Sequence, residues 1–383
     1  MNFEFATAQR IVFGAGSAGR LGALAGELGH RALVVHGASA AAARRAEPLL
    51  ATLTASGLEL ARLTVAGEPT VAWARTAAET ARSADCDLVV GIGGGSVIDA
   101  GKAVAALAVN AGDPLDYLEV VGAGQPLTAP SLPYLALPTT AGTGSEVTRN
   151  AVLTSEQQQV KASLRSPHML PAVALVDPEL THGLPAELTA TTGLDALTQL
   201  IEPLTSARAQ PLTDALCRDG IPRAARHLRA ACADEPAARE QMALASLLGG
   251  LALANAGLGA VHGLAAPLGG RCGAPHGAVC AALLAPVMAA NVAAARRQGL
   301  TAVLARYDEV ARLVTGEPDA KADDGVAFVA ELVRDLRVPT LAHWGVTAAE
   351  LPAIAAAGLA ASSMKANPVA LDEATLVAVI AQA

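Results

Sequence analysis

Short apolar runs alternate with longer segments of helical periodicity through the first half of the chain. Runs of strand length occur at 32–35, 60–65, 87–92 and 134–137. Helical stretches follow the first two runs, one ending near residue 56 and the other spanning 71–83. Because apolarity within the runs is continuous rather than alternating, we expect strands that are covered on both faces. The rhythm predicts an open α/β sheet in which helices connect parallel strands.

The pattern changes after the apolar segment 173–178. From Pro185 onward, long Ala- and Leu-rich helical segments are separated by glycines and prolines, and no intervening segment is typical of a strand. A chain of 383 residues is long enough for two domains, each with its own core. We therefore predict an α/β domain over residues 1–178 and an all-α domain over residues 179–383.

One uncharged stretch, 242–261, approaches the roughly 20 residues that a membrane-spanning helix needs. It consists mainly of Ala, Gly and Leu, contains Asn255, and lacks the aromatic residues that anchor a helix at a bilayer surface. This composition favours a helix buried at the centre of the all-α domain, and we expect no membrane partner.

Composition narrows the functional classes. Hydrophobic residues make up 52% of the chain and charged residues 16%, as expected of a compact globular protein rather than a disordered one. The formal net charge of −8 argues against nucleic acid as a partner. Five cysteines without a Cys-x-x-Cys pair, and a start without a signal pattern, indicate a reducing compartment, so we predict a cytoplasmic protein.

Glycines follow the third apolar run. Gly93, Gly94, Gly95 and Ser96 stand where a strand is expected to end and a helix to begin. Glycines let the backbone approach a pyrophosphate, whose charge is stabilised by the free N–H groups and dipole of the helix. The segment matches neither Gly-x-Gly-x-x-Gly nor a Walker loop. A tight strand-to-helix turn without a ligand is the alternative.

A second loop, rich in hydroxyl groups, follows the fourth run. Thr139, Thr140 and Thr143 stand among glycines in the segment 138–146. An ordinary Ser/Thr turn is one interpretation. Because the carboxyl ends of parallel strands line nucleotide-binding crevices, two such loops on neighbouring strands favour a dinucleotide site.

Four side chains in the second half have the chemistry of a divalent-metal site. Asp195 and Gln199 are one helical turn apart, and His262 and His276 follow later in the chain. A carboxylate with neutral imidazoles suits Zn²⁺ or Fe²⁺, either of which can polarise a substrate oxygen. Taken alone, such a pair on a helix is also typical of a surface, and such histidines are also typical of loops and cores.

Taken together, these motifs make the chain resemble the iron-containing (group III) alcohol dehydrogenase family. The resemblance runs in order through Arg10–Gly16, Gly93–Ser96 with Asp99 and Lys102, Pro138–Thr140, Thr143–Glu146, Asp177–Pro178, Gly193–Thr198, His262–Ala265, Pro275–Gly277 and Asn367–Pro368. Each motif alone is weak, whereas the ordered set is specific.

The resemblance implies a Rossmann-like amino-terminal domain, a helical carboxy-terminal domain, and a cleft between them that holds a nicotinamide dinucleotide and a metal, in the dehydroquinate synthase-like architecture. It implies dinucleotide contacts from Gly93, Gly94, Gly95, Ser96, Asp99, Thr139, Thr140 and Thr143. It implies metal ligands at Asp195, His262 and His276. Lys161 falls where a family lysine approaches the nicotinamide, and a solvated lysine on a strand is the equal alternative. The family also implies a dimer or a larger homo-oligomer.

Two positions depart from the family pattern. The family's usual ligand one turn after the aspartate is histidine, whereas Gln199 offers an amide oxygen, a weaker and harder donor, so Fe²⁺ and Zn²⁺ both stay open. Ala266 replaces a second histidine that the family often carries four residues after His262.

Cofactor choice depends on the strand that ends at Gly37. An acidic residue at this point binds the 2′-hydroxyl of NAD and repels the 2′-phosphate of NADP. Neither Gly37 nor Ser39 carries a negative charge, so we expect NADP to be accepted as well as NAD.

These observations predict an oxidoreductase that transfers a hydride between NAD(P) and a small alcohol, aldehyde or ketone, with the metal site and Lys161 as its catalytic groups. Two alternatives are a maleylacetate reductase, which the segment Arg10–Gly16 also resembles, and a catalytically silent nucleotide-binding protein, which Gln199 and Ala266 keep open. Asp195 argues against typical maleylacetate reductases, which resemble this segment with asparagine in its place.

Overall fold

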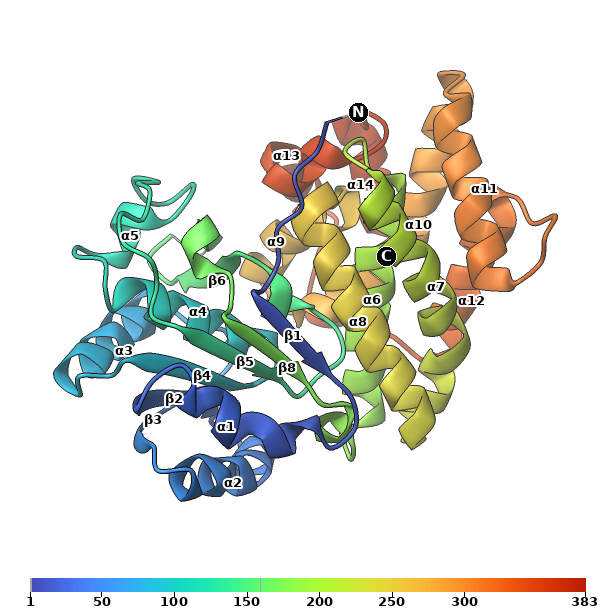
Figure 1. Cartoon of the computed structure of the whole chain (residues 1–383). Coiled ribbons are helices and arrows are strands. Elements are labelled where there is room, and N and C mark those ends of the chain that lie inside the picture. Colours follow the sequence, from blue (N-terminus) through green and yellow to red (C-terminus); the bar gives the residue numbers. More distant parts are fainter. Residues whose placement is uncertain (1, 159) are drawn as a thin grey trace. The chain divides into compact units, whose positions relative to one another are not determined.

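The structure, a computed structural model, describes residues 2–158 and 160–383, and these divide into two compact units (Figure 1). The α/β unit consists of Ala6–Thr140 and Gly144–His182. The helical unit consists mainly of Gly183–Ala383, together with the short segments 2–5 and Ala141–Thr143. Apart from these short segments, the chain passes from one unit to the other after His182.

The α/β unit contains a parallel sheet of six strands. Their order is β1-β8-β5-β4-β2-β3, and every neighbouring pair is parallel. The strands are β1 (Arg10–Phe13), β2 (Arg31–Gly37), β3 (Glu59–Val65), β4 (Leu88–Gly93), β5 (Tyr134–Pro138) and β8 (Val173–Val176). The four apolar runs correspond to β2 to β5, which confirms the predicted α/β fold.

Helices cover both faces of this sheet. They are α1 (Leu21–Gly26), α2 (Ala40–Ala55), α3 (Val71–Ser83) and α4 (Gly95–Leu107), and the short α5 (Pro114–Tyr117) packs against α3. α1 and α2 pack with Val34 and Val90 in one buried cluster, whereas α3 and α4 pack with Leu33 and Val89 in another. Because successive residues of a strand point to opposite faces, both faces need apolar side chains, and the runs are continuous for this reason.

β6 (Asn150–Ser155) and β7 (Val160–Arg165) form a separate antiparallel pair that the apolar pattern did not predict. Burial alternates along β6, where Ala151 and Leu153 enter a small core with Ala162 of β7. Only one face of this pair is packed, so it lacks the continuous apolar runs by which the main sheet was identified.

The second unit is built of helices, as predicted. They are α6 (Ala186–Thr205), α7 (Pro211–Cys232), α8 (Pro236–Ala256), α9 (Ala260–Cys272), α10 (His276–Arg297), α11 (Thr301–Thr315), α12 (Ala322–Asp335), α13 (Leu351–Ala360) and α14 (Glu373–Gln382). α6 is buried along most of its length, and its residues Leu194, Leu197 and Ile201 lie at the centre of the core. Polar residues on α6 are therefore held in an apolar interior.

The stretch 242–261 is not the continuous helix that we predicted. α8 ends at Ala256 and α9 begins at Ala260, and the two helices are bent by 100° at this break. Gly257 has a positive φ of 71°, a conformation that side-chain-bearing residues rarely adopt. The break starts a new helix just before His262.

Asn367 fixes the start of α9. Its Oδ1 accepts the backbone N–H of Ala260 at 3.1 Å, and a Cβ atom on Gly259 would lie only 2.9 Å from the same oxygen. The Nδ2 group of Asn367 donates to Asn291 Oδ1 on α10 at 2.8 Å. One side chain thus links the first turn of α9 to the middle of α10.

α10 is long and apolar enough to cross a membrane by length and composition, but 78% of that stretch is buried inside the protein. The bent pair α8 and α9 meets the same criterion only when the two helices are counted together. Burial of this kind is typical of core helices.

Candidate functional site

A stripe of polar side chains runs along the buried helix α6. Asp195, Gln199 and Glu202 are spaced so that they share one face of the helix, and their exposed fractions are 1%, 3% and 6%. Buried polar groups are costly unless they have partners, so this face must be satisfied by neighbouring helices or by a ligand.

His262, on α9, is held by the last residue of this stripe. Glu202 Oε2 lies 2.7 Å from His262 Nδ1, and Glu202 Oε1 accepts the backbone N–H of Val261 at 2.7 Å. A carboxylate beside Nδ1 favours the tautomer that carries its proton there, which leaves Nε2 free to act as a ligand. That Nε2 atom lies 3.4 Å from Asp195 Oδ1.

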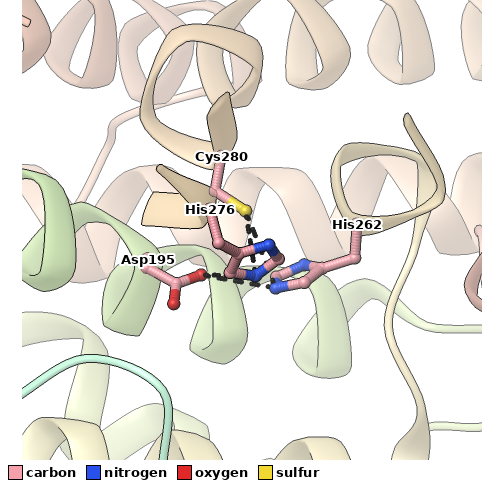
Figure 2. A group of neighbouring side chains, drawn as sticks. All are labelled: Asp195, His262, His276 and Cys280. Atoms are coloured by element: carbon pink, nitrogen blue, oxygen red, sulfur yellow. Dashed lines mark hydrogen bonds and ion pairs between the residues drawn. The ribbon is translucent and has the colours of Figure 1, made fainter. Parts of the chain in front are cut away.

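α10 brings two further side chains to the same place. His276 is its first residue, and its Nε2 lies 3.7 Å from Asp195 Oδ1. Cys280 follows one turn later, with Sγ at 3.6 Å from His276 Nε2 and 3.8 Å from His262 Nε2. Figure 2 shows the carboxylate, the two rings and the thiol converging. One donor atom from each lies within 4.8 Å of the other three.

The donor set fits a divalent cation. Asp195 Oδ1 is buried and has no hydrogen-bond partner in the described part of the chain, and the same holds for Gln199 Oε1. An unsatisfied buried carboxylate oxygen is expensive, and a bound cation would remove that cost. The structure thus brings together the three predicted ligands Asp195, His262 and His276, and it places Gln199 one turn away on the same helix.

Electrostatics in the cluster also favour positive charge. Burial alone would raise the pKa of Asp195, but the neighbouring His276 and His262 outweigh burial and lower it. Burial opposes a charge on His262, yet its neighbours Cys280 and Asp195 hold its pKa well above the usual value. The neighbouring sulfur of Cys280 and the carboxylate of Asp195 outweigh burial and raise the pKa of His276 to about 9. A divalent metal would displace the protons that the two rings hold.

Cys280 was missed in the sequence. The motifs that predict the ligands end at Gly277. A single cysteine in an alanine-rich helix does not by itself indicate a metal site. Its spacing of four residues from His276 was the available signal, because residues one helical turn apart share a face.

The glycine loop lies at the carboxyl end of β4. Gly94 is the N-cap of α4, and no side chain caps this helix, so the N–H groups of Gly95 and Ser96 at its start are available to a ligand or solvent. Thr139 N donates to Gly93 O at 2.9 Å, and a Cβ atom on Gly94 would lie 3.3 Å from Thr140 Oγ1. The two predicted loops are therefore in contact, at the ends of neighbouring strands.

Other predicted dinucleotide residues occupy distinct surroundings. Gly37 ends β2, which is adjacent to β4, and Ser39 caps α2 by accepting the N–H of Ala42 at 3.1 Å. Thr143 belongs to the helical unit, unlike Thr139 and Thr140.

Asp99 is part of a buried internal network. Its partner Lys102 is 1% exposed, with Nζ at 3.1 Å from Asp99 Oδ1 and 2.9 Å from Thr148 Oγ1. Asp99 Oδ2 accepts the N–H of Val152 at 3.0 Å, so this residue ties α4 to the β6–β7 pair.

Lys161 lies on β7, and its ammonium group is 3.2 Å from Glu68 Oε1. Its side chain is mostly buried, at 12% exposed, so Lys161 is not the fully solvated strand lysine of the alternative interpretation. Its predicted approach to the nicotinamide stays a prediction.

Comparisons with known proteins agree with this geometry. The family model described as iron-containing alcohol dehydrogenase matches residues 8–178, and the model for the C-terminal part of that family matches residues 189–383. The 1,3-propanediol dehydrogenase of Klebsiella pneumoniae is 39% identical over 79% of this chain and 77% of its own. The 4-hydroxybutyrate dehydrogenase of Cupriavidus necator is 38% identical over 78% of each. A crystal structure of 1,3-propanediol oxidoreductase superposes with a TM-score of 0.91 at 35% identity, covering 100% of both chains. The chain belongs to the iron-containing alcohol dehydrogenase family.

Proposed function

We propose that this protein catalyses reversible hydride transfer between NAD(P) and a small alcohol with its aldehyde or ketone. The observation that carries the proposal is the convergence of Asp195, His262 and His276 around a buried carboxylate oxygen that accepts no hydrogen bond from the described residues. In reduction, a bound dihydronicotinamide would supply the hydride for the carbonyl carbon, and solvent would supply the proton for the oxygen. Oxidation of the alcohol is the reverse.

The metal would be held by Asp195, His262 and His276, with Cys280 and Gln199 as the nearest further donors. A bound divalent metal supplies a Lewis acid that polarises the substrate oxygen and stabilises negative charge on it. Glu202 orients the His262 ring through the 2.7 Å contact at Nδ1. The apolar surroundings of α6 limit access of water to these groups, which strengthens their electrostatic effect.

The dinucleotide would be bound by the glycine loop after β4 and the hydroxyl-rich segment 138–146 after β5. Gly93, Gly94, Gly95 and Ser96 offer backbone N–H groups to the pyrophosphate at the start of α4, and Thr139, Thr140 and Thr143 offer hydroxyl groups. Asp99 acts indirectly in this proposal, because both of its oxygens have partners within the unit. Lys161 is proposed to lie near the nicotinamide.

The relatives indicate the type of substrate. They include dehydrogenases of 1,3-propanediol, 4-hydroxybutyrate and choline, each of which carries a primary alcohol. We therefore propose a short primary alcohol and its aldehyde as the reacting pair. The homo-oligomeric assembly and the cytoplasmic location stay predictions.

A turnover assay tests the proposal. Protein purified without chelator is offered a panel of short aldehydes with NADH or NADPH, and oxidation of the dihydronicotinamide is followed by absorbance. We expect turnover that falls by at least about a hundredfold in Asp195→Ala, since that variant removes the charged ligand. The exposed His30→Ala serves as the control. Absence of turnover with every aldehyde and both cofactors, in metal-loaded protein, would contradict the proposed activity.

A further inference from the structure

We propose that Cys280 is a metal ligand through its sulfur, and that it shifts the selectivity of this centre from Fe²⁺ toward Zn²⁺. The inference rests on the proposed function only in placing the metal at Asp195, His262 and His276. It concerns which atoms bind the metal and which metal they prefer.

The geometry of α10 places the sulfur among the other donors. His276 and Cys280 are one turn apart on this helix, so both side chains project from the same face. Cys280 is buried, and its Sγ lies 3.6 Å and 3.8 Å from the Nε2 atoms of His276 and His262. Separations of this size are those of atoms that share one ion, because Zn–S and Zn–N bonds are about 2.3 Å and 2.0–2.1 Å long.

Cys280 also restores a donor that the helix α6 lacks. The family pattern supplies a histidine at position 199, and Gln199 replaces that imidazole with a weaker amide oxygen. Asp195, His262, His276 and Cys280 again provide four strong donors within 4.8 Å of one another. The loss on α6 and the gain on α10 therefore compensate each other.

Charge balance supports a thiolate. Asp195 and a deprotonated Cys280 contribute two negative charges, which neutralise a divalent cation in an interior where Asp195 is 1% exposed. Metal coordination deprotonates a thiol, so the ligand and the charge arise together.

The chemical class of the donors points to zinc. Thiolate is a soft ligand that Zn²⁺ binds in both structural and catalytic sites. Replacing it with an oxygen or nitrogen donor removes its contribution to the preference for Zn²⁺ over Fe²⁺. Zn²⁺ already binds more tightly than Fe²⁺ at most sites with nitrogen and oxygen donors. The useful quantity is therefore the change in the ratio of the two affinities when the sulfur is removed.

Cys272 gives a matched control for the removal of a thiol. Cys272 lies in the same unit, on α9, where its Sγ is 3.0 Å from Leu268 O. It is not part of the metal-ligating group that the described residues form. Cys272→Ala removes a thiol from the helix that carries His262 without removing a proposed ligand.

The first experiment uses the unaltered protein. The chelator-treated chain is loaded with Co²⁺, which occupies zinc sites and gives a near-ultraviolet sulfur-to-cobalt charge-transfer band when a thiolate is bound. We expect this band in the wild-type protein and in Cys272→Ala, and its displacement by added Zn²⁺. A Co²⁺-loaded wild-type protein without the band would overturn the inference, whether or not the enzyme turns over.

The second experiment measures affinity by competition with a chromophoric chelator. Cys280→Ala is expected to weaken Zn²⁺ binding by about tenfold or more and to lower the ratio of Zn²⁺ to Fe²⁺ affinity, whereas Cys272→Ala leaves both unchanged. Adding Gln199→His to Cys280→Ala should restore four strong donors, and with them metal binding, but not the zinc preference. Unchanged Zn²⁺ affinity in a folded Cys280→Ala would also overturn the inference.

These outcomes separate the inference from the proposed activity. A thiolate-bound Co²⁺ or Zn²⁺ in a protein that reduces no aldehyde would leave Cys280 as a ligand while the proposed function fails. Turnover in a protein whose cobalt spectrum lacks the sulfur band would leave the function intact while the Cys280 assignment fails.

Discussion

Glu202 Oε2 lies 2.7 Å from His262 Nδ1, on the opposite side of the ring from Asp195. The carboxylate fixes both the orientation and the tautomer of the ring, so it controls whether Nε2 can bind a metal. We predict that Glu202→Ala lowers metal affinity by roughly 10–100-fold while leaving the three ligands in place. Titration of the chelator-treated protein with Zn²⁺ measures this effect.

Glu202→Gln is the matched control for that prediction. Its amide can orient the ring but carries no charge, so we expect an intermediate loss of affinity. Equal metal affinity in the wild-type protein and Glu202→Ala would show that His262 is positioned by packing alone.

Gly94 lies against the second loop, and a side chain there would crowd it. A Cβ atom on Gly94 would lie 3.3 Å from Thr140 Oγ1, and the larger Val would also cover the uncapped start of α4. We predict that Gly94→Val weakens dinucleotide binding by at least about tenfold, or ~1.4 kcal/mol. Fluorescence titration with NADH and NADPH measures the affinity. Gly26→Val, at an exposed position with open space, is the control. Equal affinities for the two variants would contradict pyrophosphate binding at this loop.

Cofactor choice can be altered at Ser39 more cleanly than at Gly37. A Cβ atom on Gly37 would lie 2.8 Å from Ala42 Cβ, so an acidic residue does not fit there. Ser39 is exposed and caps α2, and Asp is an equally good cap. We predict that the wild-type protein uses NADPH and that Ser39→Asp lowers kcat/KM for NADPH about tenfold or more relative to NADH, by repelling the 2′-phosphate.

Steady-state kinetics with both cofactors measure this ratio. Ser39→Asn keeps the cap without the charge and should retain the wild-type ratio. A wild-type protein that uses NADH alone would contradict the prediction that the end of β2, which lacks an acidic residue, accepts the 2′-phosphate of NADPH.

Glu146 makes the stability of the α/β unit depend on pH. Burial raises the pKa of Glu146 to about 7 from 4.5, although the charge of Lys102 opposes this rise. The unfolded chain loses this proton near pH 4.5 and the folded chain only near pH 7, so the free energy of unfolding falls as pH rises between these values. Each pKa unit corresponds to about 1.4 kcal/mol, so the loss is roughly 3 kcal/mol.

Glu146→Gln removes the titrating group while keeping its shape. We predict that urea denaturation at a series of pH values between 4 and 8 gives a flatter profile for this variant than for the wild-type protein, as expected of the linkage between protonation and folding. The exposed Glu47→Gln is the control and should reproduce the wild-type slope. Parallel profiles for Glu146→Gln and the wild-type protein would contradict the buried, protonated state.

The sequence predicted the parts of the fold that have strong local patterns. β2 to β5 were visible because their residues are buried on both faces, and α3 was predicted over the same residues that form it. The β6–β7 pair was missed because only alternate positions of β6 are buried, and its apolar run is short. The break at Gly257 was missed because the glycines in 242–261 are spread through an apolar stretch, and nothing local shows that Asn367 closes on the start of α9.

The candidate site was predictable where its residues belong to motifs. Asp195, His262 and His276 were found from their segments and from the resemblance, and the structure gathers them from α6, α9 and α10. Glu202 and Cys280 were missed, although each is one or two turns from a predicted ligand on its helix. Both depend on which face of a helix meets its neighbours, and tertiary packing determines that.

Through Asn367, the positions of the metal-ligating side chains depend on a segment that lies far from them in the sequence. Its single side chain joins the first turn of α9 to Asn291 on α10, and these two helices carry His262, His276 and Cys280. Local opening of the segment around residue 367 would free the start of α9 and separate the donors without global unfolding. Amide hydrogen exchange at Ala260 therefore reports how often this link between the two ligand-bearing helices opens.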